Sequence, residues 1–470
     1  MMQEKFDVIV VGAGPAGIFT SLELIDQYPE IKILIIDKGR TIDKRNCSAR
    51  KTGICVNCKP CGITSGWSGA GAFSDGKLSL SPAVGGRVTD YMSNEQAQEL
   101  VNYVDSIYLK FGASPVVHGL NSKKFDEIAY EASKYQIQVI PCPIRHLGTE
   151  LAFEVLKRMH DYLTSKGNVI FRELLTVTEI LAENDEVKGV RAVTLNGIEE
   201  AVLAPVVVVA PGRAGAEWLA EQTKKLNIKT ENNEVDIGVR VEVPNSIMDH
   251  LTQELYEPKL VYFSDTFDLK TRSFCVNPGG VVSEEHYDGE LAVVNGHSYA
   301  DESLKTGNTN FALLVSTRFT EPFNQPIEYG KYIARLANML TGGGIMVQRL
   351  GDLLRGRRTD YSKLRKSSTI PTLKTAVPGD LSYVLPQRYL TSLVETLKAF
   401  DNIAPGLYSK HTLLYGVEVK FYSSKVTVKN TFETSIKNLY AIGDGAGITR
   451  GLIQASVTGV VVARDIAKRK

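Results

Sequence analysis

The sequence is poor in cysteine, lacks long apolar runs and carries almost no net charge. Its 470 residues include six cysteines, 54 lysines and arginines, and 53 aspartates and glutamates. Six cysteines are too few for a disulfide scaffold in a chain of this length. Without an apolar run of about 18 residues we expect no membrane span, and the balanced charge disfavours a nucleic-acid partner.

The length and the first residues narrow the class further. At roughly 100–200 residues per domain, a chain of this length should form two or more lobes. The opening sequence MMQEKFDVIVVGAGPAG leads directly into an apolar run and a glycine turn, without the small-residue cleavage site of a secretory signal. We therefore expect a soluble, cytoplasmic protein.

The first 40 residues follow the pattern strand, glycine-rich turn, helix, strand. Buried-strand runs at residues 6–11 and 31–37 flank GAGPAG and a helical pattern. Gly12 permits a tight turn, Gly14 lets backbone approach a pyrophosphate, and Gly17 lets the helix pack on the strand. The helix N-terminus attracts phosphate, and Asp37 is spaced to hold ribose hydroxyls. The predicted cofactor contacts here are Gly12, Gly14, Pro15, Ala16, Gly17, Asp37 and Lys38.

A second glycine motif near the C-terminus distinguishes FAD from NAD. In LYAIGDGAGITRG, Asp444 can accept hydrogen bonds from ribityl hydroxyls, and the following turn can aim N–H groups at the flavin. The run VVVVAPG at 206–212 predicts another strand beside the cofactor, and the glycine-rich run after Cys61 can lie flat against a ring or diphosphate. These segments add as predicted contacts Gly69, Ala70, Gly71, Val177, Ala210, Gly212, Gly443, Asp444, Gly451 and Leu452.

Together these motifs resemble the glutathione-reductase-type FAD superfamily. The segments GWSGAGAFSDGKL, GVRVE, FCVNPGG, VNGHS, LYGVEVKFYS and AIGDGAGITRG resemble a narrower group, the bacterial uncharacterised FAD-dependent dehydrogenases, over nearly the whole chain. The resemblance implies an α/β fold: an FAD-binding Rossmann-like domain of the glutathione-reductase type with a discontinuous mixed α+β substrate or cap domain. It implies little about the substrate.

We expect the chain to cross between these domains more than once. The predicted segments are a first FAD-binding part with the cysteines (1–84), a helical insertion (85–145), a second FAD-binding part with a β-meander (146–231), a substrate or cap domain (232–404), and strands returning to the FAD-binding domain (405–470). Within the second FAD-binding part, NVIFRELLTVTEI reads as one strand.

Four of the six cysteines, Cys47, Cys55, Cys58 and Cys61, fall within 15 residues. Gaps of two residues let one loop point successive thiolates at a common centre, which suits a four-iron cluster or a tetrahedral zinc. Disulfide reductases of the resembled superfamily place a redox cysteine pair in a comparable position. The sequence leaves four interpretations open: an iron–sulfur cluster, zinc, a redox dithiol, or no special role.

Catalytic residues are less clearly marked than cofactor residues. His297 could donate a proton, and Lys77 and Arg450 could contact the flavin or a substrate, so these three are weak candidates. No second NAD(P) fingerprint is found, since TGGGIM reads as the end of a helix that starts near Pro326. NAD(P)H would then act only as a transient co-substrate.

These observations predict an FAD-dependent oxidoreductase, a dehydrogenase or reductase acting on a small organic substrate. A ferredoxin-like electron carrier becomes an attractive partner if the cysteines hold a cluster. The cation-rich segment 355–366 could bind an anionic substrate or an acidic electron donor, or could simply be a solvated basic face. The alternatives are a non-catalytic electron-transfer flavoprotein and a flavin monooxygenase.

Overall fold

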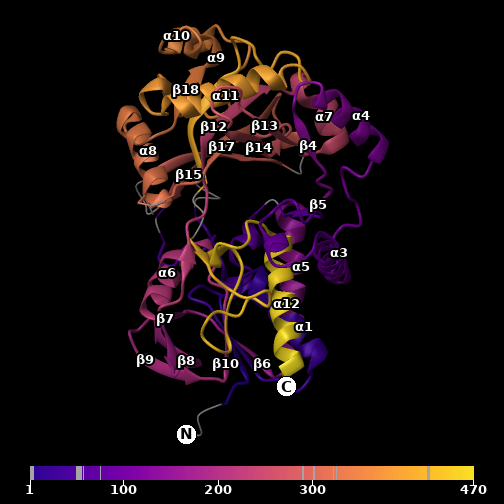
Figure 1. Ribbon diagram of the computed structural model, residues 1–470, viewed down its shortest axis with the longest axis vertical. Coiled ribbons are helices and arrows are strands. Elements are labelled where there is room, and N and C mark those ends of the chain that lie inside the picture. The colour runs from indigo at the N-terminus through magenta and orange to yellow at the C-terminus, as the bar shows by residue number, and fades with distance from the viewer. Residues whose placement is uncertain are drawn as a thin grey trace. The chain divides into compact units, whose positions relative to one another are not determined.

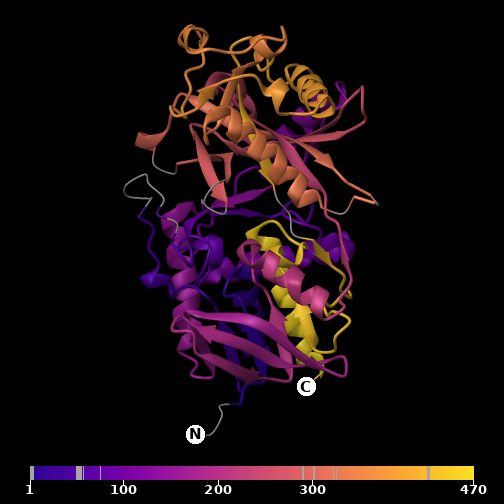
Figure 2. The same ribbon diagram turned by 90° about the vertical axis from the view of Figure 1, so that its left-hand side faces the viewer.

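The computed structural model describes residues 5–48, 56, 58–74, 76–287, 291–299, 302–320, 322–323, 325–420 and 424–469. The chain forms two compact units (Figures 1 and 2), and each is described by itself. Unit 1 comprises Met1–Val116, Arg145–Asn233 and Ser423–Lys470, and unit 2 comprises Val117–Ile144 and Glu234–Tyr422. The predicted helical insertion 85–145 is thus divided between the units.

Unit 1 is built on a five-stranded parallel sheet whose strands are buried on both faces. In spatial order the strands are β22 (Leu439–Ala441), β10 (Val206–Val209), β1 (Val8–Val11), β2 (Ile33–Ile36) and β6 (Val169–Arg172). Helices α1 (Pro15–Gln27) and α12 (Leu452–Arg469) pack side by side (Figure 1). Gly459 permits this contact, because a Cβ there would lie 2.3 Å from the Ala16 carbonyl oxygen.

A three-stranded antiparallel meander, at the lower edge of Figure 2, lies between β6 and β10 in sequence. Its strands are β7 (Leu175–Glu183), β8 (Glu186–Thr194) and β9 (Glu199–Leu203). The single strand expected for NVIFRELLTVTEI is wrong. Leu174 adopts a positive φ of 57°, which breaks the run, so that β6 joins the parallel sheet and β7 begins the meander.

Unit 1 also contains three more long helices and two small pairs of strands. They are α3 (Asn94–Lys110), α5 (Gly148–Thr164) and α6 (Ala216–Lys225), with β11 (Thr230–Glu231) paired to β21 (Lys425–Val426) and β3 (Lys77–Ser79) paired to β5 (Ile144–His146). Ser93 starts α3 with a capping box to Gln96.

Unit 2 is a mixed, mainly antiparallel eight-stranded sheet. Its order is β19 (Val377–Pro378), β18 (Met346–Arg349), β20 (Leu413–Lys420), β12 (Val235–Pro244), β17 (Asn308–Thr317), β14 (Lys270–Asn277), β13 (Lys259–Phe263) and β4 (Gln138–Ile140). Strand β4 belongs to the predicted insertion, and its pairing with β13 places that part of the insertion in unit 2.

Helices and a hairpin complete unit 2. The helices are α4 (Ser122–Ser133), α7 (Asn245–Leu255), α8 (Pro326–Thr341), α9 (Leu350–Leu353), α10 (Tyr361–Arg365) and α11 (Gln387–Phe400), and the hairpin is β15 (Val281–Tyr287) with β16 (Leu291–His297). Gly342, with a φ of 68°, ends α8, as the TGGGIM motif predicts. Within the described residues, no helix is both long and apolar enough to cross a membrane.

Candidate functional site

The carboxyl ends of the parallel strands of unit 1 bring the sequence motifs together. Gly12 follows β1, Gly212 follows β10, Gly443 follows β22, and Asp37 follows β2. Strand β1 lies between β2 and β10, so the order of the strands reverses at β1. Crevices at such reversal points are where open α/β sheets bind ligands.

Two glycines hold the first turn close to its neighbours. Gly12 has a φ of 103°, and a Cβ there would lie 2.1 Å from the carbonyl oxygen of Ala210. A Cβ on Gly17 would lie 2.1 Å from the carbonyl oxygen of Gly12. Any side chain at either position would collide with backbone, so these glycines build the turn between β1 and α1.

Gly14 is different, because nothing lies within 4 Å of where its Cβ would be. It is the N-cap of α1 and makes no side-chain cap, so the first-turn N–H groups of the helix have no acceptor within the helix. A Cβ on Gly69 would lie 3.4 Å from the Gly14 Cα, and one on Gly443 would lie 3.3 Å from the Ala16 Cβ. These glycines form an open cradle of bare backbone, the glycine cradle, which fits a pyrophosphate.

A second surface of small residues adjoins the cradle. Gly69, Ala70 and Gly71 belong to a short 3-10 helix (Gly69–Phe73). A Cβ on Gly71 would lie 3.1 Å from Leu452 Cδ2, at the start of α12, and one on Gly451 would lie 3.4 Å from the Gly85 Cα. The N-terminal, cysteine-proximal and C-terminal motifs therefore meet in unit 1.

Asp37 makes contacts that the sequence did not indicate. Its Oδ2 accepts a hydrogen bond from the Ala13 N–H (3.0 Å), and its Oδ1 accepts from Gly39 (2.8 Å) and Gly66 (2.7 Å). These bonds tie the fingerprint turn to the glycine-rich loop and use most of the acceptor capacity of the carboxylate. Lys38 donates to the Ala214 carbonyl oxygen (3.2 Å).

Asp444 follows Gly443 in a short 3-10 helix (Asp444–Ala446). Burial raises the pKa of its carboxyl group, and the charge of Arg213, whose Nε lies 3.7 Å away, lowers it in part. Its Oδ1 accepts a hydrogen bond from the Thr449 hydroxyl (2.7 Å). The carboxylate is thus fixed in place by one neutral donor, with acceptor capacity left for hydroxyl groups of a ligand.

Arg45 shapes the glycine-rich loop, and sequence reasoning missed it. Its buried guanidinium donates to the carbonyl oxygens of Gly62 (3.1 Å), Ile63 (2.5 Å) and Trp67 (2.5 Å). Burial lowers the pKa of Arg45 to about 10, against the opposing effect of nearby Asp37. The signal that could have found it is an arginine between Asp37 and a glycine-rich loop whose carbonyl groups need donors.

Three of the four clustered cysteines lie among the described residues. Cys47 is half-buried and Cys58 and Cys61 are exposed, while Cys55 lies outside the described residues. Burial would raise the pKa of the Cys61 thiol, but hydrogen bonds from the backbone N–H groups of Ile63 and Thr64 and from the Thr64 side chain lower it overall. Among the described residues no three Cys, His, Asp or Glu side chains are grouped to hold a metal. Because Cys55 is not among the described residues, the predicted four-cysteine set stays a prediction.

The remaining predicted residues are spread over both units. Lys77 lies on β3 and Val177 on β7, while the Arg450 N–H donates to the Gly85 carbonyl oxygen (2.7 Å), all in unit 1. His297 ends β16 in unit 2, with its ring edge-on to Tyr299 at 5.1 Å between centroids. No contact between these groups follows from the structure.

Unit 2 holds a group of buried polar side chains that sequence reasoning did not assemble. The odd-numbered residues of β12 join the hydrophobic core, whereas Arg240 faces the other side of the sheet and is fully buried. Its guanidinium contacts Asn310 (Nε–Oδ1 2.8 Å), Glu418 (Nη1–Oε2 3.1 Å) and the Cys275 carbonyl oxygen (Nη2–O 2.7 Å). Lys420 Nζ pairs with the same Glu418 at 2.9 Å. We call Arg240, Asn310, Glu418 and Lys420 the polar centre.

The polar centre has marks of a functional site. Asn310 Nδ2 is buried and has no hydrogen-bond partner among the described residues, and the amide orientation is fixed because Oδ1 accepts from Arg240. Cys275 adopts a φ of 48° at a bulge between β14 and β17, where its carbonyl group turns toward Arg240. Gly296 is required beside it, since a Cβ there would lie 2.1 Å from Arg240 Nη2. The motifs GVRVE, FCVNPGG, VNGHS and LYGVEVKFYS all contribute residues to this region.

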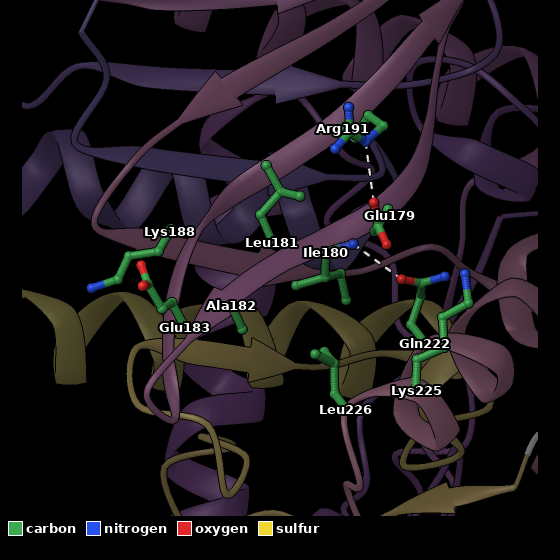
Figure 3. Close-up of a pocket in the computed structure, with 10 residues that line it drawn as sticks. All are labelled: Glu179, Ile180, Leu181, Ala182, Glu183, Lys188, Arg191, Gln222, Lys225 and Leu226. Carbon is green, nitrogen blue, oxygen red and sulfur yellow. Dashed lines mark hydrogen bonds and ion pairs between the residues drawn. The ribbon is translucent and has the colours of Figure 1, made fainter.

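A hollow of about 580 Å³ opens on unit 1 between β7, β8 and α6 (Figure 3). None of the predicted cofactor residues lines it. Two of its polar groups are already bonded: Arg191 pairs with Glu179 (3.1 Å), and Gln222 accepts from the Ile180 N–H (3.0 Å). The hollow is therefore not the predicted cofactor site, which lies at the glycine cradle.

Comparison with known proteins gives one family match, within unit 2, and one relative along nearly the whole chain. Residues 234–421 match the family described as "FAD-dependent protein, C-terminal domain-like". An uncharacterized protein of Clostridium beijerinckii is 27% identical over 481 residues, which cover 98% of this chain and 80% of the relative.

Solved structures of oxidoreductases overlap at low similarity. A variant of E. coli quinol fumarate reductase FrdA has 14% identity and a TM-score of 0.44, covering 100% of this chain and 71% of its own. A variant of Aspergillus oryzae formate oxidase has 12% identity and a TM-score of 0.45, covering 100% and 99%. The L-proline dehydrogenase of P. horikoshii has 12% identity and a TM-score of 0.40, covering 100% and 95%.

Proposed function

We propose that the protein is an FAD-dependent oxidoreductase, a dehydrogenase or reductase that acts on a small organic molecule. The observation that carries the proposal is the glycine cradle, where open backbone at Gly14 and uncapped N–H groups of α1 meet Gly69 and the turn at Gly443. The match of residues 234–421 to FAD-dependent proteins supports FAD rather than NAD as the occupant.

In this proposal each group of residues has a separate task. The first turn of α1 holds the pyrophosphate, Asp444 accepts from ribityl hydroxyls, and the adenosine ribose lies near Asp37 and Lys38. FAD, when bound, supplies the hydride or electron transfer. The polar centre supplies a donor, Asn310 Nδ2, for an acceptor atom of the substrate. His297, Lys77 and Arg450 stay predictions as proton donors or anion contacts.

The test begins with the colour of the purified protein. We expect a flavin absorbance spectrum and one FAD per chain, or uptake of FAD by the apoprotein. A colourless protein that takes up no FAD would contradict the proposal. Anaerobic addition of NADH, NADPH and a panel of metabolites should then bleach the flavin with at least one small molecule.

The same assay separates the two alternatives. An electron-transfer flavoprotein would be bleached by a protein carrier and by none of the metabolites. A flavin monooxygenase would consume oxygen in the presence of NAD(P)H and a substrate that it hydroxylates. Bleaching by a metabolite without oxygen consumption supports the dehydrogenase or reductase.

The cysteine segment is given no step in this proposal, and an iron–sulfur cluster there stays a prediction from the spacing. Iron and acid-labile sulfide at about four of each per chain, in anaerobically purified protein, would support a cluster. Zinc alone, or neither metal, would contradict it. This outcome leaves the FAD proposal unaffected, because the glycine cradle contains no cysteine.

A further inference from the structure

A short segment of unit 2 concentrates positive charge. Residues 349–366 contain seven lysines and arginines and two aspartates, a net charge of +5. Because the whole chain carries +1, the rest of the chain carries −4. The charge of the protein is therefore balanced only on average, and one surface is strongly basic.

The segment has a defined structure that displays its cations. It runs from the end of β18 through α9 and α10. Two hydrogen bonds hold it together: Arg349 Nη1 donates to the Lys363 carbonyl oxygen (3.2 Å), and Lys363 Nζ donates to the Arg358 carbonyl oxygen (2.5 Å). Figure 1 shows α9 and α10 close together in unit 2. The Asp360 side chain caps α10 by accepting from the Lys363 N–H (2.9 Å). We call residues 349–366 the basic surface.

Asp352 organises the basic surface from beneath without neutralising it. Its side chain is 1% exposed and bonds Arg349 Nε (2.9 Å) and the Thr359 hydroxyl (2.8 Å). Burial would raise the pKa of its carboxyl group, but the hydrogen bonds from Arg349 and Thr359 lower it, so it stays ionised. The outer cations remain at the surface: Arg355, Arg357, Arg358, Arg365 and Lys366 are all exposed.

Exposed apolar side chains lie among these cations and indicate the kind of partner. Leu354 is 43% exposed and Tyr361 60% exposed, and Ile370, just beyond the segment, is 75% exposed. Protein interfaces combine an apolar centre with a charged rim, whereas a phosphate backbone offers no apolar counterpart. The composition of the surface therefore favours an acidic protein over a nucleic acid.

A flavoenzyme needs a source or acceptor of electrons, and the glycine run at 342–344 does not provide a nicotinamide site. Gly342 ends α8 with a φ of 68°, whereas a phosphate-binding turn precedes a helix. We propose that the basic surface docks a small acidic electron-transfer protein. This inference rests on the proposed function, because only a redox enzyme requires such a carrier. Each encounter passes one electron to the flavin, so two encounters and two protons complete its two-electron reduction.

The experiment measures binding of a plant-type [2Fe–2S] ferredoxin, an acidic one-electron carrier, to the FAD-loaded protein by calorimetry at low ionic strength. The variant Arg365→Glu/Lys366→Glu reverses two exposed cations at the C-terminal end of α10 for which the described residues provide no side-chain hydrogen bond or ion pair. The matched control Lys224→Glu/Lys225→Glu reverses two exposed cations at the end of α6 in unit 1. The same charge change is thus made at two helix ends.

We expect the ferredoxin Kd to rise about ten-fold or more in the α10 variant and to stay within about two-fold in the control, with a loss of affinity at high salt. Equal weakening in both variants would mean that only net charge matters and would overturn the docking surface. So would an absence of ferredoxin binding to the wild-type protein. If the protein binds duplex DNA or phosphatidylserine vesicles more tightly than ferredoxin, and the α10 variant loses that binding, the partner of the basic surface is that ligand and not an acidic protein.

The flavin content of every sample is recorded from its absorbance spectrum. A protein without FAD that still binds ferredoxin through α10 would contradict the proposed function and leave the docking surface standing. A protein that holds FAD and is bleached by metabolites, but does not bind ferredoxin, would support the proposed function and contradict the docking surface.

Discussion

The glycine cradle of unit 1 and the polar centre of unit 2 are built in opposite ways. The cradle is bare backbone at the ends of strands and helices, and its glycines come from three motifs that each span a few residues. The polar centre consists of long charged and amide side chains that project from β12, β17 and β20 onto a buried face of the sheet. The first can be filled without disturbing the fold, whereas the second is part of what holds the fold together.

The largest effect on cofactor binding that tests this comparison is expected for Gly14→Asp. The φ of Gly14 is −75° and no atom lies within 4 Å of its Cβ position, so aspartate fits and also caps α1. Its negative charge, however, occupies the place proposed for the pyrophosphate. We expect the FAD content to fall by about ten-fold or more, which corresponds to a loss of about 1.4 kcal/mol or more in binding.

The unfolding midpoint of Gly14→Asp, followed by tryptophan fluorescence, should stay near that of the wild-type apoprotein, because both tryptophans, Trp67 and Trp218, lie in unit 1. Gly12→Ala is the contrasting variant: with a φ of 103° and the Ala210 carbonyl oxygen 2.1 Å from the new Cβ, it should lower that midpoint. A Gly14→Asp protein that keeps its full FAD content would show that the pyrophosphate does not lie at α1.

The same contrast explains what the sequence could and could not predict. The two glycine motifs are local patterns, so the parallel sheet, α1 and the turns at Gly12 and Gly443 follow from a few neighbouring residues. The alternation in VDIGVRVEVP instead predicts a strand with one solvated face, but both faces are buried. Nothing near Arg240 in sequence shows that Glu418 lies against it, because that contact depends on the pairing of β12 with β20.

A second limit concerns residues whose role is to hold loops. Asp37 was predicted from its spacing as a ribose ligand, yet three backbone N–H groups occupy it. Arg45 carried no motif, although its donors fix the loop between Gly62 and Trp67. Side chains that satisfy irregular backbone are set by the folded path of the chain, which periodicity and spacing do not describe.

The largest effect on folding stability is expected from the variant Glu418→Gln in the polar centre. Removing this charge leaves Arg240 and Lys420 buried without an anionic partner, and breaking a buried ion pair in this way costs about 3–5 kcal/mol. Unit 2 contains no tryptophan, so far-UV circular dichroism reports its unfolding, and the protection of β20 amides in hydrogen exchange reports it locally. The stability read by circular dichroism and the protection of the β20 amides should both decrease.

Lys420→Met provides the control for Glu418→Gln. Arg240 and Glu418 still pair in that variant, and methionine replaces the lysine stem without leaving a buried charge alone. We expect a loss of about 1 kcal/mol or less. If the two variants destabilise unit 2 equally, Glu418 does not act as the shared partner of both cations.

The smallest effect tests whether unit 1 also depends on a buried carboxylate. Glu433 is 2% exposed; burial would raise its pKa, but hydrogen bonds from Arg469 and Lys429 lower it from 4.5 to about 2. A carboxylate with a lowered pKa stabilises the folded state above its unfolded pKa, and that contribution is lost as the pH falls from about 4.5 toward 2. Glu433→Gln should therefore destabilise unit 1 at pH 7, with the difference from wild type disappearing over this acid range, as read by tryptophan fluorescence in urea.

The loss of stability in Glu433→Gln should be smaller than in Glu418→Gln, because water reaches Arg469 (38% exposed) and Lys429 (65% exposed) and solvates them when their partner is removed. A pH-independent difference would assign Glu433 a packing role, and the contrast between a backbone-built unit 1 and a charge-built unit 2 would then be stronger.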